Sequence, residues 1–281
     1  METFVFLAVL FAAACHAAWN ALIKVGLDPL STTTLISVGS AIVALAFAPI
    51  VGMPALAAWP WLVSSVVIHL VYFASLIESY RTGDLGQVYP IARGSAPLMT
   101  AAVTSAFVGE RLSALGWTGI VVLVAGVLLL SVRGGRTLAE IDRRAIGFAL
   151  ITALTICTYS VVDGVGARLS GSPNAYSVWL FVGIAVVMVP YALFRDGTDV
   201  IPAMQKFWLR GFAGGALQVL SYGIAIWAMT VAPIAIVATL RETSVLFGAA
   251  IAVVVLKEPL RAARVLAACL IVCGLVLIRL Q

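Results

Sequence analysis

The stretch RGSAPLMTAAVTSAFVGERLSA, residues 93–114, has a counterpart in RETSVLFGAAIAVVVLKEPLRA, residues 241–262. The two stretches are offset by 148 positions, which places Arg93 on Arg241 and Glu110 on Glu258. Shared alanines and leucines mean little in so apolar a chain, but charged residues are rare in it. Two matched arginines, each 17 residues before a matched glutamate, therefore indicate an internal repeat.

The whole chain is far more apolar than a water-soluble domain. Of its 281 residues, 63% are hydrophobic and 10% are charged, whereas an average soluble protein has about 45–50% and about 25%. The mean hydropathy is +1.12. Long, nearly uncharged runs recur from end to end, which is typical of an α-helical membrane protein that crosses the bilayer several times.

The runs predict an all-α polytopic membrane protein with ten transmembrane helices. Allowing about 20 residues per crossing, we expect helices near 3–24, 31–51, 60–79, 86–108, 113–132, 145–165, 175–194, 209–229, 233–256 and 262–280. A polar linker, 133–144, separates a five-helix repeat over 1–132 from a second five-helix repeat over 145–281. Because each repeat holds an odd number of spans, the second enters the membrane inverted. Inverted repeats are typical of secondary transporters, whose substrate site lies between the halves.

Loop charge predicts the orientation of the chain. The ends of the first, third, fifth, seventh and ninth spans and the connections after them carry Lys24, Arg81, Arg133, Arg136, Arg143, Arg144, Arg195, Lys206, Arg210, Lys257, Arg261 and Arg264. The opposite side carries Arg111, Arg168 and Arg279. Because cytoplasmic loops are enriched in Lys and Arg, we expect a multi-pass protein of the cell (inner) membrane with both termini outside.

Three stretches carry a resemblance to a known family. They are AAWNALIKVG (17–26) in the first span, GERLSALGWTGIVVLVAGVLL (109–129) after the fourth, and KEPLRAARVLAACLIVCGLVLI (257–278) after the ninth. Together they resemble the drug/metabolite transporter (DMT) superfamily, EamA type. The resemblance implies ten helices around a central cavity that work by alternating access without ATP. It leaves the substrate open, because the family handles amino acids, sugars, phosphorylated metabolites and cationic drugs.

Arg93 and Arg241 are the first candidates for the substrate site. A charge at mid-membrane costs a few kcal/mol and so faces a polar cavity or a partner. Pro90, Gly94 and Pro97 surround Arg93 and predict a helix that is kinked or broken there, with free backbone groups. The alternative is structural: both arginines pair with Glu242 and hold the halves together.

The balance of these three charges bears on the substrate. Arg93, Arg241 and Glu242 sum to +1, and a carboxylate or phosphonate would neutralise that excess through bidentate hydrogen bonds to arginine. Glu242 has no counterpart in the first repeat, where Gly94 aligns with it. We therefore expect Glu242 to be either a coupling charge or a structural one.

Polar and aromatic residues are predicted to line the rest of the cavity. His16, Asn20 and Trp19 lie on the first helix, and His69 and Tyr72 share a face of the third. Each also suits helix packing, and His69 is assigned a coupling or structural role. Tyr89, Gln218 and Tyr222 complete the predicted lining. We place Asp163 at the rim and regard Glu110 and Glu258 as structural.

The sequence therefore predicts a secondary transporter of a small anionic or zwitterionic organic metabolite, and no enzyme. No nucleotide, metal or nucleic-acid motif is present, so no cofactor and no metal are expected. Two alternatives stay open: an exporter of amino acids or cationic compounds, and a non-transporting membrane subunit or lipid flippase. The sequence also leaves open proton or ion coupling, and whether the protein is a monomer or a homodimer.

Overall fold

Each apolar run forms a helix, because in lipid the backbone N–H and C=O groups must bond within the segment. The structure is a computed structural model that describes residues 1–23, 27–82, 85–131, 143–254, 257 and 262–281. Within these ranges the side chains of 22–23, 79–82, 85–90, 130–131, 203 and 252 are outside the description. The predicted linker at 133–144 lies almost wholly outside the described residues.

The first repeat contributes five long helices, which are α1 (Thr3–Ile23), α2 (Pro29–Val51), α3 (Trp59–Thr82), α4 (Leu85–Val103) and α5 (Ala114–Ser131). The second contributes α6 (Arg143–Leu169), α7 (Pro173–Asp196), the short α8 (Val200–Gln205), α9 (Trp208–Val231), α10 (Ile234–Arg241), α11 (Ser244–Val254) and α12 (Ala262–Arg279). Eight described segments are long and apolar enough to cross a membrane, and Ala114–Leu129 is a shorter apolar helix. With α4, these correspond to the ten predicted spans, α10 and α11 together forming the ninth.

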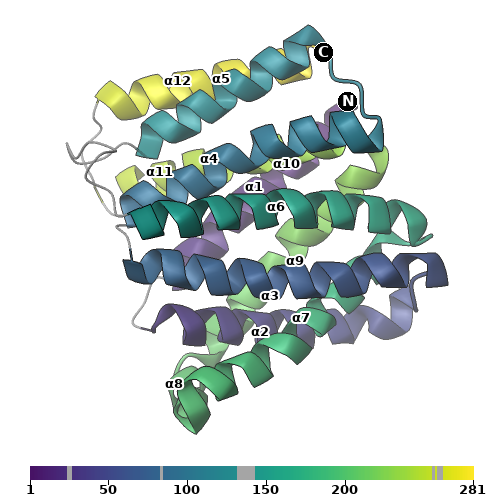
Figure 1. The fold of residues 1–281 in the computed structure, drawn as a ribbon, viewed down its shortest axis with the longest axis vertical. Helices are drawn as coiled ribbons and strands as arrows, with labels where there is room; N and C mark the ends of the chain where they lie inside the picture. Colours follow the sequence, from purple (N-terminus) through teal and green to yellow (C-terminus); the bar gives the residue numbers. More distant parts are fainter. Residues whose placement is uncertain (24–26, 83–84, 132–142, 255–256, 258–261) are drawn as a thin grey trace.

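Packing between the repeats follows a pseudo-twofold relation. Helix α3 packs on α6, and the corresponding pair, α9 and α1, packs likewise. The α4–α6 contact is repeated by α11 and α1. Helices α2 and α7 pack on each other, as do α5 and α12 (Figure 1). The two helices of each pair correspond to each other in the repeat, so each pair straddles the pseudo-twofold axis. The fold is thus the predicted pair of five-helix inverted repeats.

Glycines allow the α5–α12 contact to be very close. A Cβ atom added to Gly119 would lie 3.0 Å from the carbonyl oxygen of Gly274, and one added to Gly274 would lie 2.8 Å from the carbonyl oxygen of Gly119. The reciprocity of the two distances is what a twofold relation requires. Small residues of this kind let transmembrane helices approach backbone to backbone.

A helix interruption is present in the second repeat, at the position that corresponds to Arg93, and not at Arg93 itself. Helix α4 is continuous from Leu85 to Val103, although Pro97 removes a backbone donor. The ninth span is the one that breaks: α10 ends at Arg241, Glu242 and Thr243 form a turn, and α11 begins at Ser244. Of the kink or break predicted at Arg93, the break is therefore absent from α4. A proline is tolerated inside a transmembrane helix when neighbouring helices and hydroxyl groups satisfy the freed backbone groups.

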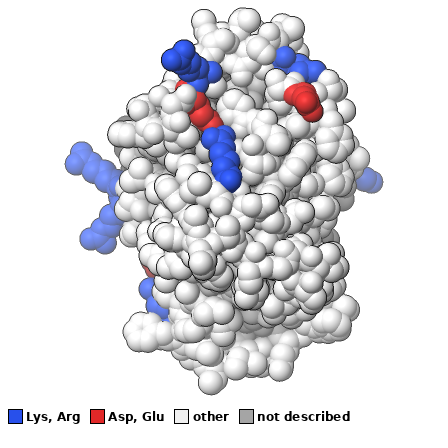
Figure 2. Space-filling model, turned by 90° about the vertical axis from the view of Figure 1, so that its right-hand side faces the viewer, with Lys and Arg blue, Asp and Glu red and all other residues white. Residues whose placement is uncertain are grey.

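The two chain ends meet at one end of the bundle. The guanidinium of Arg279 donates to the carbonyl oxygen of Met1 and to the hydroxyl of Thr3. Figure 2 views the side of the bundle on which both termini lie, and most of the surface it shows is uncharged. Termini on the same side agree with an even number of membrane crossings.

Candidate functional site

One arginine of the predicted pair forms a buried ion pair between the repeats. The Nε atom of Arg93, on α4, lies 2.8 Å from Oε2 of Glu242, in the turn after α10. Both side chains are 5% exposed. Because removing either charge would leave the other buried, the pair must hold α4 close to the broken ninth span.

Arg241, the repeat partner of Arg93, has a different environment. Its side chain is buried at 7% exposure, and its Cζ atom lies 4.6 Å from the ring centroid of Tyr222, in a cation–π contact. Among the described residues no carboxylate forms an ion pair with Arg241. The repeat explains this difference: Arg93 is paired with Glu242, and the reciprocal carboxylate for Arg241 would have to come from position 94, which is Gly94.

Asp163 lies behind Tyr222 in the core of the molecule. Its two carboxylate oxygens accept hydrogen bonds from the hydroxyl of Tyr176 at 2.9 Å and from the hydroxyl of Tyr222 at 2.5 Å. The residue is fully buried, so its predicted position at the rim was wrong. The prediction ended the sixth span at residue 165, whereas α6 continues to Leu169 and carries Asp163 deeper. Tyr222 therefore touches both Arg241 and Asp163.

An aromatic cluster extends from Tyr222 to α3. The ring of Tyr159 lies 5.9 Å from that of Tyr222 and stacks on His69 at 4.4 Å, and Tyr72 lies 5.5 Å from Tyr159. The Nδ1 atom of His69 is 2.9 Å from the carbonyl oxygen of Ser65 on its own helix. The structure thus brings the predicted residues Tyr72, His69 and Tyr222 together around the ring of Tyr159.

The first helix places His16 and Trp19 side by side. Their rings are in an edge-to-face contact at 5.1 Å, and Arg93 and Arg241 are both within electrostatic range of His16. The indole N–H of Trp19 is buried and has no hydrogen-bond partner among the described residues. Asn20 donates instead to the carbonyl oxygen of His16, 2.8 Å away on the same helix.

Gln218, another predicted lining residue, lies at the contact between α9 and α2. Gln218 accepts a hydrogen bond at 2.9 Å from the hydroxyl of Ser40, so its amide oxygen joins α9 to α2. The side chain of Tyr89 lies outside the described residues. Within the described ranges no group of three or more His, Cys, Asp or Glu residues could hold a metal ion.

Glu110 ties the two repeats together at one end of the bundle. Its carboxylate accepts hydrogen bonds from the backbone N–H of Ile234 at 2.8 Å and of Ala235 at 3.3 Å, at the start of α10. Arg168 adds an ion pair at 2.8 Å and also donates to the carbonyl oxygen of Met229 at 2.9 Å. A carboxylate at a helix N-terminus is favoured by the helix dipole. Glu258, its repeat partner, lies outside the described residues.

Two inverted five-helix repeats with a buried ion pair between them are typical of helical membrane transporters. The sequence model of the EamA-like transporter family matches residues 3–132 and 143–280. The chain therefore belongs to that family, which is part of the drug/metabolite transporter superfamily.

A solved structure titled "Crystal structure of protein" has the same fold. It is 19% identical in sequence, with a TM-score of 0.78, over 99% of this chain and 96% of its own. In all, 29 chains among solved structures match this one. No curated protein matches.

Proposed function

We propose that this protein is a secondary transporter of a small organic metabolite that carries an acidic group. The observation that supports this proposal best is the unequal environment of the two repeat-related arginines. Arg93 has a carboxylate partner in Glu242, whereas Arg241 has none among the described residues. A buried guanidinium without a carboxylate is suited to take one from a substrate.

The substrate group would bind Arg241 in the plane of its guanidinium. The Cζ atom of that group lies over the Tyr222 ring, and a guanidinium carries five N–H donors that a planar or tetrahedral anion can accept. A carboxylate or phosphonate can accept two of these hydrogen bonds at once. Water-poor surroundings strengthen such a charged pair.

The formal charges favour a zwitterion over a simple anion. Arg93, Arg241, Glu242 and Asp163 are all buried, and with both carboxylates ionised their charges cancel. A zwitterionic substrate would leave this balance unchanged. The aromatic rings of Tyr72, Tyr159 and Tyr222 offer faces on which an ammonium group can be held by cation–π attraction.

Transport would proceed by alternating access between the two repeats, with both chain termini outside the cell. The Arg93–Glu242 pair joins α4 to the broken ninth span, and Glu110 joins the tip of the first repeat to the start of α10. Rocking of one inverted repeat against the other is the usual motion in transporters of this construction. The Glu110 contacts would have to separate when that end opens.

A ligand screen on the purified protein tests the proposal. Thermal shift should show stabilisation by amino acids or other small acids, and proteoliposomes should show saturable uptake of the stabilising compound. Arg241→Gln should abolish both effects and Arg241→Lys should retain part of them. Arg195→Gln is the matched control, because Arg195 pairs with Glu78 at a half-exposed site. Stabilisation by amines alone would instead support an exporter of cationic compounds, and absence of saturable flux would support a non-transporting subunit.

A further inference from the structure

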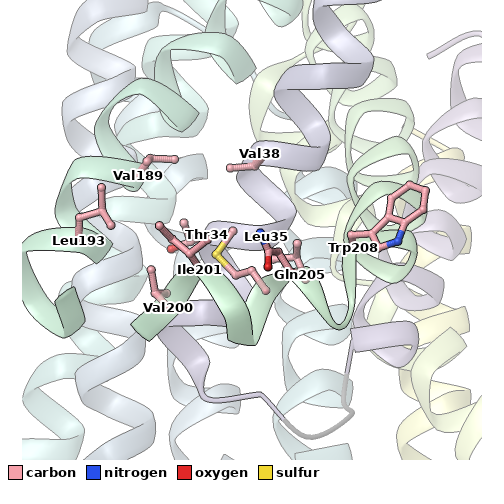
Figure 3. Close-up of a pocket in the computed structure, with 10 residues that line it drawn as sticks. Thr34, Leu35, Val38, Val189, Leu193, Val200, Ile201, Gln205 and Trp208 are labelled. Atoms are coloured by element: carbon pink, nitrogen blue, oxygen red, sulfur yellow. The ribbon is translucent and has the colours of Figure 1, made fainter. Parts of the chain in front are cut away.

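A cavity is lined by residues of α8, and Figure 1 shows α8 at one end of the bundle. It has a volume of about 270 Å³ and is formed by α2, α7, α8 and the start of α9 (Figure 3). Its lining is aliphatic except for Thr34, Gln205, the thioether of Met204 and the indole of Trp208. The hydroxyl of Thr34 donates to the carbonyl oxygen of Leu30, so it offers no free donor to a ligand.

Two cations contact one aromatic ring in the segment that includes the lining residues Gln205 and Trp208. Phe207 falls between the lining residues Gln205 and Trp208. The Nζ atom of Lys206 lies 5.5 Å from the centroid of the Phe207 ring, and the Cζ atom of Arg210 lies 5.7 Å from it. Both cations therefore contact the same ring, and they lie close in the chain to residues that line the apolar cavity.

These two charges are available for an external anion. Neither Lys206 nor Arg210 forms an ion pair with a carboxylate of the described residues. Arg195, which is also at this end, is paired with Glu78 at 3.0 Å. Since like charges held close together repel, an anionic group between Lys206 and Arg210 would stabilise the arrangement.

Part of the cavity lining reaches the molecular surface. Ile201 and Trp208, which line it, are 45% and 60% exposed on the surface of a chain whose exposed side chains are largely apolar. Tryptophan at such a position is typical of the membrane–water interface. A water-soluble ligand would find almost no polar partner in the lining, whereas a hydrocarbon chain would find aliphatic contacts throughout.

We propose that this cavity binds one anionic phospholipid. The acyl chain lies between α2, α7 and α8, and the phosphate is held between Lys206 and Arg210. Basic groups beside gaps between transmembrane helices bind anionic headgroups in this way, most strongly at the cytoplasmic face. Loop charge predicts that this end of the bundle is cytoplasmic. The bound lipid would hold α8 in place between α7 and α9 of the second repeat.

Lipid binding can be measured without any knowledge of the transported substrate. The delipidated full-length protein is titrated with phosphatidylglycerol or phosphatidylcholine of identical acyl chains, and retained lipid is counted by native mass spectrometry. Phosphatidylglycerol should bind more tightly. The double variant Lys206→Gln/Arg210→Gln should reduce that preference about 25-fold, since each basic residue near the surface contributes about fivefold. Arg143→Gln removes an exposed cation elsewhere and should leave the preference unchanged.

A second measurement locates the acyl chain. Brominated phosphatidylglycerol should quench the part of the fluorescence that is lost in Trp208→Phe. Filling the cavity with Val189→Phe should remove this quenching, whereas Val186→Phe, on the exposed face of the same helix, should not. Equal retention of the two lipids by the unmodified protein would overturn the proposal. So would an effect of Arg143→Gln as large as that of the double variant, or quenching that survives Val189→Phe.

Discussion

Arg93 and Glu242 lie on opposite repeats, and their side chains meet at 2.8 Å in the interior. The same twofold relation that sets Arg93 on Arg241 sets Gly94 on Glu242. Of these two equivalent positions, one therefore has a carboxylate side chain and the other, a glycine, has no side chain beyond hydrogen. This single difference divides the two arginines into a paired one and one without a carboxylate partner.

Breaking the buried pair should destabilise the fold more than breaking a surface pair. Glu242→Gln leaves the Arg93 charge buried and is expected to cost about 3–5 kcal/mol of unfolding free energy. Arg93→Gln/Glu242→Gln should regain most of this loss. Glu78→Gln, which breaks the partly exposed pair with Arg195, should cost much less, because water screens that pair. Chemical denaturation in micelles measures all three, and equal losses for Glu242→Gln and Glu78→Gln would contradict a structural role of the pair.

Restoring the missing carboxylate should block acid binding at Arg241. A side chain at position 94 needs room, because a Cβ atom there would lie 2.6 Å from Leu128. We therefore expect Gly94→Glu/Leu128→Ala to pair with Arg241 and to lower the affinity for the transported acid at least tenfold. Leu128→Ala alone is the control and should bind normally. Unchanged affinity in the double variant, measured by isothermal titration, would argue against Arg241 as the acid anchor.

The ring and the hydroxyl of Tyr222 are predicted to have separate roles, the ring toward Arg241 and the hydroxyl toward Asp163. Tyr222→Phe keeps the ring under Arg241 and removes the hydroxyl bond to Asp163. It should cost about 1–3 kcal/mol of stability, the cost of an unsatisfied buried acceptor, and change substrate affinity little. Tyr222→Leu removes the ring as well and should weaken affinity further. If the two variants bind substrate equally well, the cation–π contact does not position Arg241.

The Glu110 contacts should control access at one end of the bundle. Glu110→Gln loses the charge that faces Arg168 and the start of α10. The expected result is several-fold faster maleimide labelling of Ala238→Cys, which is 6% exposed, in a background without the four native cysteines. Val231→Cys is exposed already and should label at an unchanged rate. Equal rates for Ala238→Cys with and without Glu110→Gln would show that this contact does not close that end.

Asp28 should make α2 sensitive to acid. Its carboxylate caps the helix by accepting from the N–H groups of Leu30 and Ser31 at 2.9 and 3.1 Å. Partial burial opposes ionisation, but the hydrogen bonds from Ser31 and Leu30 outweigh it and lower the pKa of Asp28 below its ordinary value. The stabilisation is therefore complete above the ordinary carboxyl range and is lost as the pH falls through the lowered value.

Two variants isolate this effect. Asp28→Ala should cost about 1 kcal/mol near neutral pH, and its difference from the unmodified protein should shrink toward about pH 3. Asp28→Asn keeps a capping oxygen that does not titrate and serves as the control. A difference between the unmodified protein and Asp28→Ala that stays constant with pH, followed by thermal unfolding, would contradict the assignment.

The spans and the repeat could be predicted because they depend on rare charges in a uniform apolar background. The positions of Arg93 and Arg241 gave the twofold relation, and that relation then fixed which helices pack together. The depth of Asp163 could not be predicted in the same way. It depends on the end of α6, which lies at Leu169, four residues beyond the predicted end of the span. The break at Glu242 could not be predicted either. The prolines that predict an interruption lie in α4, where neighbouring groups satisfy the backbone.

The pairing of Glu242 with one of the two repeat-related arginines, Arg93, has a consequence for how such a protein can be built. Two identical five-helix chains assembled about a true dyad would place a glutamate beside both arginines or beside neither. Joining both halves in one polypeptide removes that constraint, so each half can be altered alone. An asymmetric binding site inside a nearly symmetric fold can therefore form when the two repeats are covalently linked, but not in a symmetric homodimer of single repeats.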